Sequence, residues 1–158
     1  MSQGLRAAEK IVSVDGARAQ VRAWLEAGER VVVASGVFDL IQAGHVRTLA
    51  RARALGDRLV VCLLDDRTTG ERLGKGRPLV PAAERARVCA ALRVVDRVTI
   101  ASGRDADALP AELGVTYARG ADSALAASEQ EGAGHLGVDV GERGSFDLVA
   151  RLRAGGGA

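Results

Sequence analysis

The stretch SGVFDLIQAGH, residues 35–45, holds the residue types in this chain that are best suited to chemistry. It lies between an apolar run and a helical pattern that begins at His45, so we expect a strand, a glycine turn and a helix N-terminus. Gly36 allows a backbone conformation that a Cβ would hinder, and Gly44 lets chain or ligand approach closely. Helix N-termini attract phosphate, and Gln42 and His45 would add side-chain donors. The stretch therefore predicts a phosphate cradle of the kind that nucleotides occupy.

The same residues carry a family resemblance. GVFDLIQAGH resembles the G-x-F-D-x-x-H-x-G-H signature of the cytidylyltransferase-like nucleotidyltransferases, and the similarity continues through HVRTLARARALGDRLVV. Over residues 10–152 the chain is similar to the nucleotidyltransferase domain of the bacterial ADP-heptose synthases, and more distantly to glycerol-3-phosphate cytidylyltransferases. The first histidine of the signature is Gln42 in this chain, and its amide donates a hydrogen bond but cannot become cationic.

The resemblance implies a reaction in which an acceptor phosphate attacks the α-phosphorus of a nucleoside triphosphate and pyrophosphate leaves. Catalysis then depends on aligning two phosphates and stabilising negative charge, without a general base or a covalent intermediate. The expected catalytic residues are His45, Gln42 and Lys75, with Lys75 as the displaced equivalent of a lysine in the family's Leu-Lys-Gly run. Mg²⁺ is expected to bind through the phosphates, with no protein ligand.

The resemblance also implies two groups of binding residues. The nucleotide site is expected to contain Gly36, Val37, Phe38, Asp39, Gly44, Arg119, Gly120, Asp122 and Ser145. The acceptor site is expected to contain Asp66, Arg72, Arg77 and Arg85. Structural alternatives stay open at this point, because Phe38 could simply pack in the core, Asp66 could be an exposed strand-end residue, and the loop cations could be solvated surface charges.

Several positions depart from the family pattern. Relatives have Lys-Gly-Gly-Asp where this chain has RGAD at residues 119–122. Their Ser-Thr-Thr run is reduced to Ser145, and the nearby Asp147 would repel a phosphate. Leu64 and Val80 replace residues that are usually polar in the heptose enzymes. With the replaced histidine and the shifted lysine, these departures favour a second hypothesis, a catalytically impaired nucleotide-binding or interaction module of the same fold.

Strand and helix patterns alternate along the chain. Strands are expected at residues 30–35, 58–64, 96–100, 115–118 and 136–140, and a mobile loop at residues 67–80. Helices are expected at residues 17–27, 45–55, 81–92, 105–113, 123–131 and 146–153, with Pro110 forcing a break or kink. The alternation predicts an α/β fold: a Rossmann-like, doubly wound, five-stranded parallel sheet flanked by helices. We expect one domain, residues 1–154, and a flexible glycine-rich tail, residues 155–158.

Composition limits the function classes. The net charge is +2, with 22 basic and 20 acidic residues, which argues against a large electrostatic surface for nucleic acid or membrane. Cys62, Cys89, His45 and His135 have no spacing typical of a zinc site, and the cysteines are expected to be buried thiols. No apolar run has membrane-spanning length and the N-terminus lacks a signal-peptide core, so a cytoplasmic protein is expected. The resemblance also implies that the protein could form a homodimer.

The sequence thus favours a magnesium-dependent nucleotidyltransferase. It would join ATP or CTP to a small phosphorylated acceptor, with a sugar 1-phosphate such as heptose 1-phosphate favoured. The resemblance to the heptose enzymes favours adenylyl transfer, whereas the altered residues on the base and phosphate sides keep CTP open.

Overall fold

A parallel sheet forms the centre of the molecule. The computed structural model describes residues 6–119 and 137–139. Within them six strands pair in the order β1-β4-β3-β2-β5-β6, and every pair is parallel. The strands are β1 (Ile11–Val12), β2 (Val31–Gly36), β3 (Arg58–Leu64), β4 (Arg97–Ala101), β5 (Thr116–Arg119) and β6 (Gly137–Asp139). The helices are α1 (Val14–Glu26), α2 (Ala43–Ala54), α3 (Asp66–Leu73), α4 (Ala82–Ala91) and α5 (Gly103–Leu113), after a 3₁₀ turn at Ala7–Lys10.

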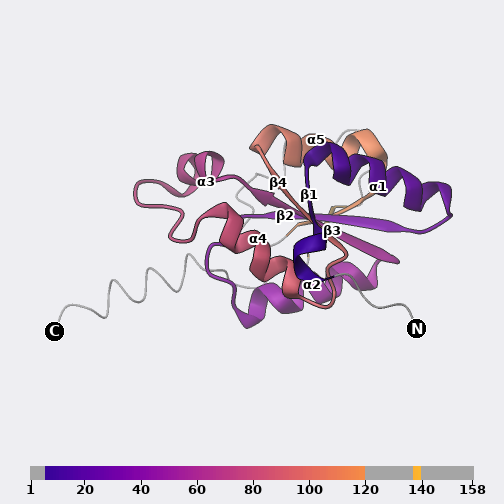
Figure 1. The fold of residues 1–158 in the computed structure, drawn as a ribbon, viewed down its shortest axis with the longest axis horizontal. Coiled ribbons are helices and arrows are strands. Elements are labelled where there is room, and N and C mark those ends of the chain that lie inside the picture. The colour runs from indigo at the N-terminus through magenta and orange to yellow at the C-terminus, as the bar shows by residue number, and fades with distance from the viewer. Residues whose placement is uncertain (1–5, 120–136, 140–158) are drawn as a thin grey trace.

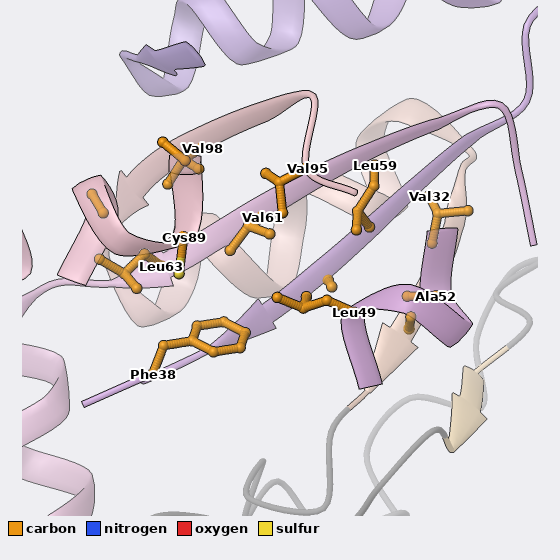
Figure 2. Packing of buried hydrophobic residues seen from close by; sticks show 14 of the residues in the cluster. Val32, Phe38, Leu49, Ala52, Leu59, Val61, Leu63, Cys89, Val95 and Val98 are labelled. Carbon is orange, nitrogen blue, oxygen red and sulfur yellow. The ribbon is translucent and has the colours of Figure 1, made fainter. Parts of the chain in front are cut away.

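Helices cover both faces of the sheet (Figure 1). On one face α2 and α4 bury Leu49, Ala86 and Cys89 against the strands, and Figure 2 shows this cluster with the ring of Phe38 pointing toward Leu49. On the other face α1 and α5 bury a second cluster that includes Trp24 and Leu109. Because β3 is covered on both sides, its residues after Arg58 are all buried, as expected for the central strand of such a sheet.

The direction of winding reverses at β2. From β2 the chain passes through α2 to β3 on one side, and it later returns to β5 on the other side of β2. The carboxyl ends of β2 and β5 therefore lie side by side, with Ser35 in register with Arg119. Open α/β sheets bind their ligands at such a switch point.

All five predicted strands are present, and their ends differ from the predicted ones by at most one residue, with both ends of β3 as predicted. The structure adds β1, which pairs Ile11 with Val98 and Val12 with Thr99 at the edge of the sheet. A two-residue strand is too short to show an alternating pattern, which explains why the sequence did not predict it.

The prediction of a loop over residues 67–80 was wrong for its first half, which forms α3. One glycine and two threonines lower the helix propensity there, but Asp65 caps the helix by accepting a hydrogen bond from the Thr68 N–H at 2.7 Å. Thr68 and Thr69 are buried, and the Thr68 hydroxyl accepts a hydrogen bond from the Gly103 N–H at 3.1 Å. Tertiary contacts thus overcome weak propensity, and only residues 74–80 form a loop.

Helices α1, α2 and α5 begin two or three residues earlier than predicted, and α4 begins one residue later. Ser13 and Ser102 cap α1 and α5 by accepting hydrogen bonds from backbone N–H groups, and α5 continues past Pro110 to Leu113. The helices predicted at residues 123–131 and 146–153 and the tail at 155–158 lie outside the described residues. Among the described helices, none has the length and apolar character needed to cross a membrane.

Candidate active site at the switch point

His45 lies in the first turn of α2, which begins at Ala43, two residues before the predicted start. Its Nδ1 accepts a hydrogen bond from the backbone N–H of Gln42, the N-cap residue, at 3.0 Å. Since Nδ1 must keep a lone pair to accept this bond, the neutral imidazole carries its proton on Nε2. The local fold of the helix terminus therefore makes Nε2–H a hydrogen-bond donor beside the first N–H groups of α2.

The turn after β2 is unusually tight. Phe38 has a φ of 51°, a left-handed conformation that is rare for a bulky residue and that clusters at functional sites. Its ring meets the imidazole of His45 edge-on, with centroids 5.8 Å apart. A Cβ on Gly36 would lie 2.8 Å from the same ring, so glycine is needed for space, whereas the sequence suggested a special backbone conformation. Phe38 thus packs in the core and also borders His45.

Asp39 is directed away from solvent and holds residues 77–80. Its carboxylate is completely buried and accepts hydrogen bonds from the N–H groups of Leu79 and Val80, each at 2.9 Å. The Arg77 Nη2 lies 2.8 Å from the same carboxylate, and the Arg77 side chain is only 6% exposed. Both residues were predicted to touch ligands, but the structure places them together as a buried clamp on the loop.

Arg85 and Asp66 form a second clamp. The Arg85 side chain is 1% exposed and donates from Nε to the Val80 carbonyl at 2.8 Å and from Nη1 to the Val37 carbonyl. Its Nη2 donates to Asp66 Oδ1 at 2.6 Å, and the same oxygen accepts from the Ala82 N–H at 2.8 Å. The pair ties the β2 turn, α3 and α4 together. The Asp66 side chain remains half exposed. Each nitrogen of the Arg85 guanidinium donates a hydrogen bond to an oxygen of the protein.

The predicted cations differ in their placement. Lys75 is exposed between Gly74 and Gly76, whose φ values are 91° and 81°, and within the described residues its ammonium has no hydrogen bond or ion pair. Arg72 lies on α3, where its Nη2 is 3.5 Å from Asp107 Oδ2 of α5. There it borders a cavity of about 440 Å³ whose lining includes none of Gln42, Asp39 and Arg85.

The β5 side of the site contains a contact that the sequence did not predict. The hydroxyl groups of Ser35 and Tyr117 are hydrogen-bonded to each other inside the sheet, and both side chains are buried. Two hydroxyl-bearing residues near the ends of adjacent strands were the available signal. The backbone of Arg119 ends β5 beside Ser35, while Gly120, Asp122 and Ser145, which were also predicted for the nucleotide site, lie outside the described residues.

Hydrogen bonds from Thr68 keep the Asp65 carboxyl group ionised near the site. Burial pushes the pKa of the Asp65 carboxyl upward, but hydrogen bonds from the Thr68 side chain and backbone N–H outweigh it and hold that pKa below its ordinary value. Asp65 is thus an ionised cap at the N-terminus of α3. Across residues 6–119 and 137–139, no three His, Cys, Asp or Glu side chains are grouped so that they could hold a metal ion.

The chain is similar in sequence to known proteins. The sequence model of the family described as cytidylyltransferase-like matches residues 33–149. The chain is 38% identical over 159 residues to the bifunctional protein HldE of Halorhodospira halophila, covering 92% of this chain and 32% of that protein. It is 40% identical over 141 residues to HldE of Azorhizobium caulinodans, covering 89% of this chain and 29% of that protein. The chain thus spans about a third of the length of these relatives.

A solved structure is also similar. The crystal structure of the lipopolysaccharide core biosynthesis protein from Thermoplasma volcanium superposes with a TM-score of 0.56 at 29% identity, covering 63% of this chain and 80% of that one. The family match includes β2, the tight turn, α2 and the loop clamped by Asp39. On this evidence, the chain belongs to the cytidylyltransferase-like family.

Proposed function

We propose that this protein is a nucleotidyltransferase that moves a nucleoside monophosphate from ATP or CTP to a small phosphorylated acceptor. The observation that carries the proposal is the His45 imidazole, whose Nδ1 accepts from the Gln42 N–H, which leaves Nε2 as its donor nitrogen, in the first turn of α2 at the switch point of the sheet. Helix N–H groups and a fixed donor at one place suit a polyphosphate.

In the proposed reaction an oxygen of the acceptor phosphate forms a bond to the α-phosphorus. The bond from that phosphorus to the oxygen bridging to the β-phosphate breaks, and pyrophosphate leaves with the electron pair. The His45 Nε2–H and the first N–H groups of α2 would donate to the phosphoryl oxygens, where negative charge increases. A preorganised donor of this kind contributes on the order of 10²- to 10³-fold in rate.

The two clamps would position the cationic loop for this reaction. Asp39 holds residues 77–80 through backbone N–H groups, and Arg85 holds the Val80 carbonyl. Lys75, exposed on the adjoining span, would pair with the departing pyrophosphate. Mg²⁺ would accompany the triphosphate, whose oxygens are the hard ligands that this ion prefers, and would supply charge neutralisation there.

Resemblance to the ADP-heptose synthases supports ATP as the donor and heptose 1-phosphate as one acceptor to test. A second candidate rests on Gln42, which stands in place of the first histidine of the family signature. Its amide cannot become cationic, and this favours a nucleotide-binding module with weak or no turnover.

Pyrophosphate release separates the two candidates. Wild type would be incubated with Mg²⁺ and ATP or CTP against heptose 1-phosphate, glucose 1-phosphate and glycerol 3-phosphate. We expect release with at least one pair and a loss in kcat on the order of 10²- to 10³-fold in His45→Ala.

His45→Asn is the matched control, because its side-chain oxygen can still accept from the Gln42 N–H but no donor reaches the position of Nε2. It should unfold at the wild-type temperature and be as inactive as His45→Ala. Absence of release with every pair, beside nucleotide binding by calorimetry, would favour the binding module.

A further inference from the structure

A cavity of about 380 Å³ opens between the turn after β2 and helix α4. Its apolar walls are formed by Phe38, Leu40, Ile41, Val80 and Val88. Its polar lining residues are Asp39, Gln42 and Arg85. The size lies within the range of small-molecule pockets, and Gln42 is also the N-cap of α2, so the cavity adjoins the phosphate cradle.

Two of the three polar residues have little to offer a ligand. The Asp39 carboxylate is completely buried and accepts from the Leu79 and Val80 N–H groups. The Arg85 guanidinium is 1% exposed and donates from each of its nitrogens to a protein oxygen. Their charges are satisfied by the fold, so they border the cavity without supplying it with hydrogen bonds.

Gln42 differs from both. In the part of the chain that the structure describes, its Nε2 is buried without a hydrogen-bond partner. Gln42 lines the cavity, so among the three polar lining side chains its amide is the one with a donor that the described residues leave unpaired, beside aliphatic and aromatic walls. A ring with many hydroxyl groups would leave most of them unpaired there, which disfavours binding.

We infer that this cavity binds the non-phosphate part of the acceptor, and that this part is compact and largely apolar, with one hydrogen-bond acceptor for the Gln42 amide. The inference rests on the proposed function and narrows its substrate class. It also separates this chain from enzymes whose acceptors carry a hydroxyl on each ring carbon.

The test uses two phosphate monoesters of equal ring size, cyclohexyl phosphate and glucose 1-phosphate. With Mg²⁺ and the nucleotide that supports turnover, wild type should use cyclohexyl phosphate with a kcat/KM about tenfold or more above that for glucose 1-phosphate. Val88→Gln places an amide at the cavity mouth, on a helix residue that is 49% exposed. It should lower this preference about tenfold through the KM for cyclohexyl phosphate, with the KM for the nucleotide unchanged.

Two further variants sharpen the result. Leu25→Gln is the matched control, because Leu25 is 37% exposed on α1, which covers the other face of the sheet, and the preference should not change. Val80→Thr adds a hydroxyl to the wall at nearly constant volume and should raise the use of glucose 1-phosphate. Equal or better use of glucose 1-phosphate by wild type would overturn the inference while leaving the transferase intact.

Direct binding keeps the inference separate from catalysis. Dissociation constants of both esters would be measured by calorimetry in the presence of a non-hydrolysable nucleoside triphosphate. Selective binding of cyclohexyl phosphate that Val88→Gln removes would support the pocket even if no turnover were found, in which case only the proposed reaction would fail. If Val88→Gln instead changed the mass in sedimentation equilibrium and left both esters unaffected, the cavity would be covered by a second copy of the chain and the inference would be wrong.

Discussion

His45 in the first turn of α2 and Gln42 at its N-cap have different roles in the proposed site. His45 has its tautomer fixed by the Gln42 backbone N–H at 3.0 Å. Gln42, in contrast, has a side-chain nitrogen without a partner among the described residues. The first residue is a preorganised donor, and the second is a donor available to a ligand. A neutral amide in this place stabilises charge less than an imidazolium would.

Gln42→His tests how much that amide limits catalysis. Restoring the imidazole of the family signature should raise kcat for pyrophosphate release by about tenfold, part of the 10²- to 10³-fold that such a donor contributes. The measurement compares kcat of the variant and of wild type at saturating nucleotide. An equal or lower kcat, with unchanged nucleotide affinity, would remove Gln42 from the catalytic residues.

At this scale the sequence predicted the place of His45 but not the partners of Asp39 and Arg85. The glycine turn and the helical pattern were enough to place His45 at a helix N-terminus. Asp39 and Arg85 were expected on ligands, yet besides the side chains of Arg77 and Asp66 their partners are backbone groups of residues 37, 79 and 80. Those backbone partners could not be predicted, because a backbone N–H or carbonyl leaves no trace in the residue type that carries it.

Elements around the site are joined by buried charge. Asp39 joins the turn after β2 to the loop before α4, and Arg85 joins α4 to α3 through Asp66. Removing one partner of a buried ion pair strongly destabilises the folded protein, because the other charge is left buried without compensation. The clamps therefore make the geometry of the site depend on the correct packing of three elements.

Asp39→Asn tests the first clamp. The amide retains one acceptor oxygen but loses the charge opposite Arg77, so the free energy of unfolding should fall by about 3 kcal/mol. Urea denaturation measures it. The matched control is Asp57→Asn at the exposed ion pair with Arg30, where a much smaller change is expected. Equal losses in the two variants would mean that the clamp adds nothing beyond a surface pair.

The Arg30–Asp57 pair makes its own prediction about acid. Hydrogen bonds from the Arg30 side chain, and then from its backbone N–H, lower the pKa of Asp57 from 3.8 to about 2. The unfolded chain therefore binds this proton at a higher pH than the folded chain, so the contribution is present above about pH 4 and is lost as the pH falls toward 2. Urea midpoints at pH 5, 4, 3 and 2 should decline more steeply in wild type than in Asp57→Asn. Parallel declines would contradict the assignment.

Element prediction succeeded where a pattern was long. β3 is a continuous apolar run, and α1 repeats apolar residues at helical spacing. β1, in contrast, has only two residues, and α3 contains weak helix formers. α3 is held by its cap at Asp65 and by the hydrogen bond from Gly103, which is far from it in the sequence. Propensity alone could not predict a helix stabilised by such distant contacts.

For the whole molecule, the strand order places β3 inside the sheet and β1 at its edge. β3 pairs with β2 and β4, and both its faces are covered by helices, whereas β1 pairs with β4 alone among the described strands. The alternation of strands and helices was sufficient to predict this parallel, doubly wound arrangement, since crossover handedness leaves few topologies.

Amide hydrogen exchange should report this gradient. Exchange in β3 should require global unfolding, and it should be about 10²-fold or more slower than exchange at Ile11 and Val12 after correction for intrinsic rates. Residue-resolved NMR exchange in heavy water provides the rates. Comparable protection in β1 and β3 would mean that the edge strand unfolds only together with the rest.

The anchoring of residues 77–80 also limits the entropy that a ligand must remove. Since Asp39 and Arg85 fix that stretch and α3 ends at Leu73, only Gly74, Lys75 and Gly76 lie between the two anchored parts. The Gly74 N–H donates to the Gly70 carbonyl, and the Gly74 carbonyl accepts from the Arg77 N–H. Immobilising one residue costs about 1–2 kcal/mol. A lysine carried on so short a span can engage a ligand at a small fraction of the cost that ordering a long loop would impose.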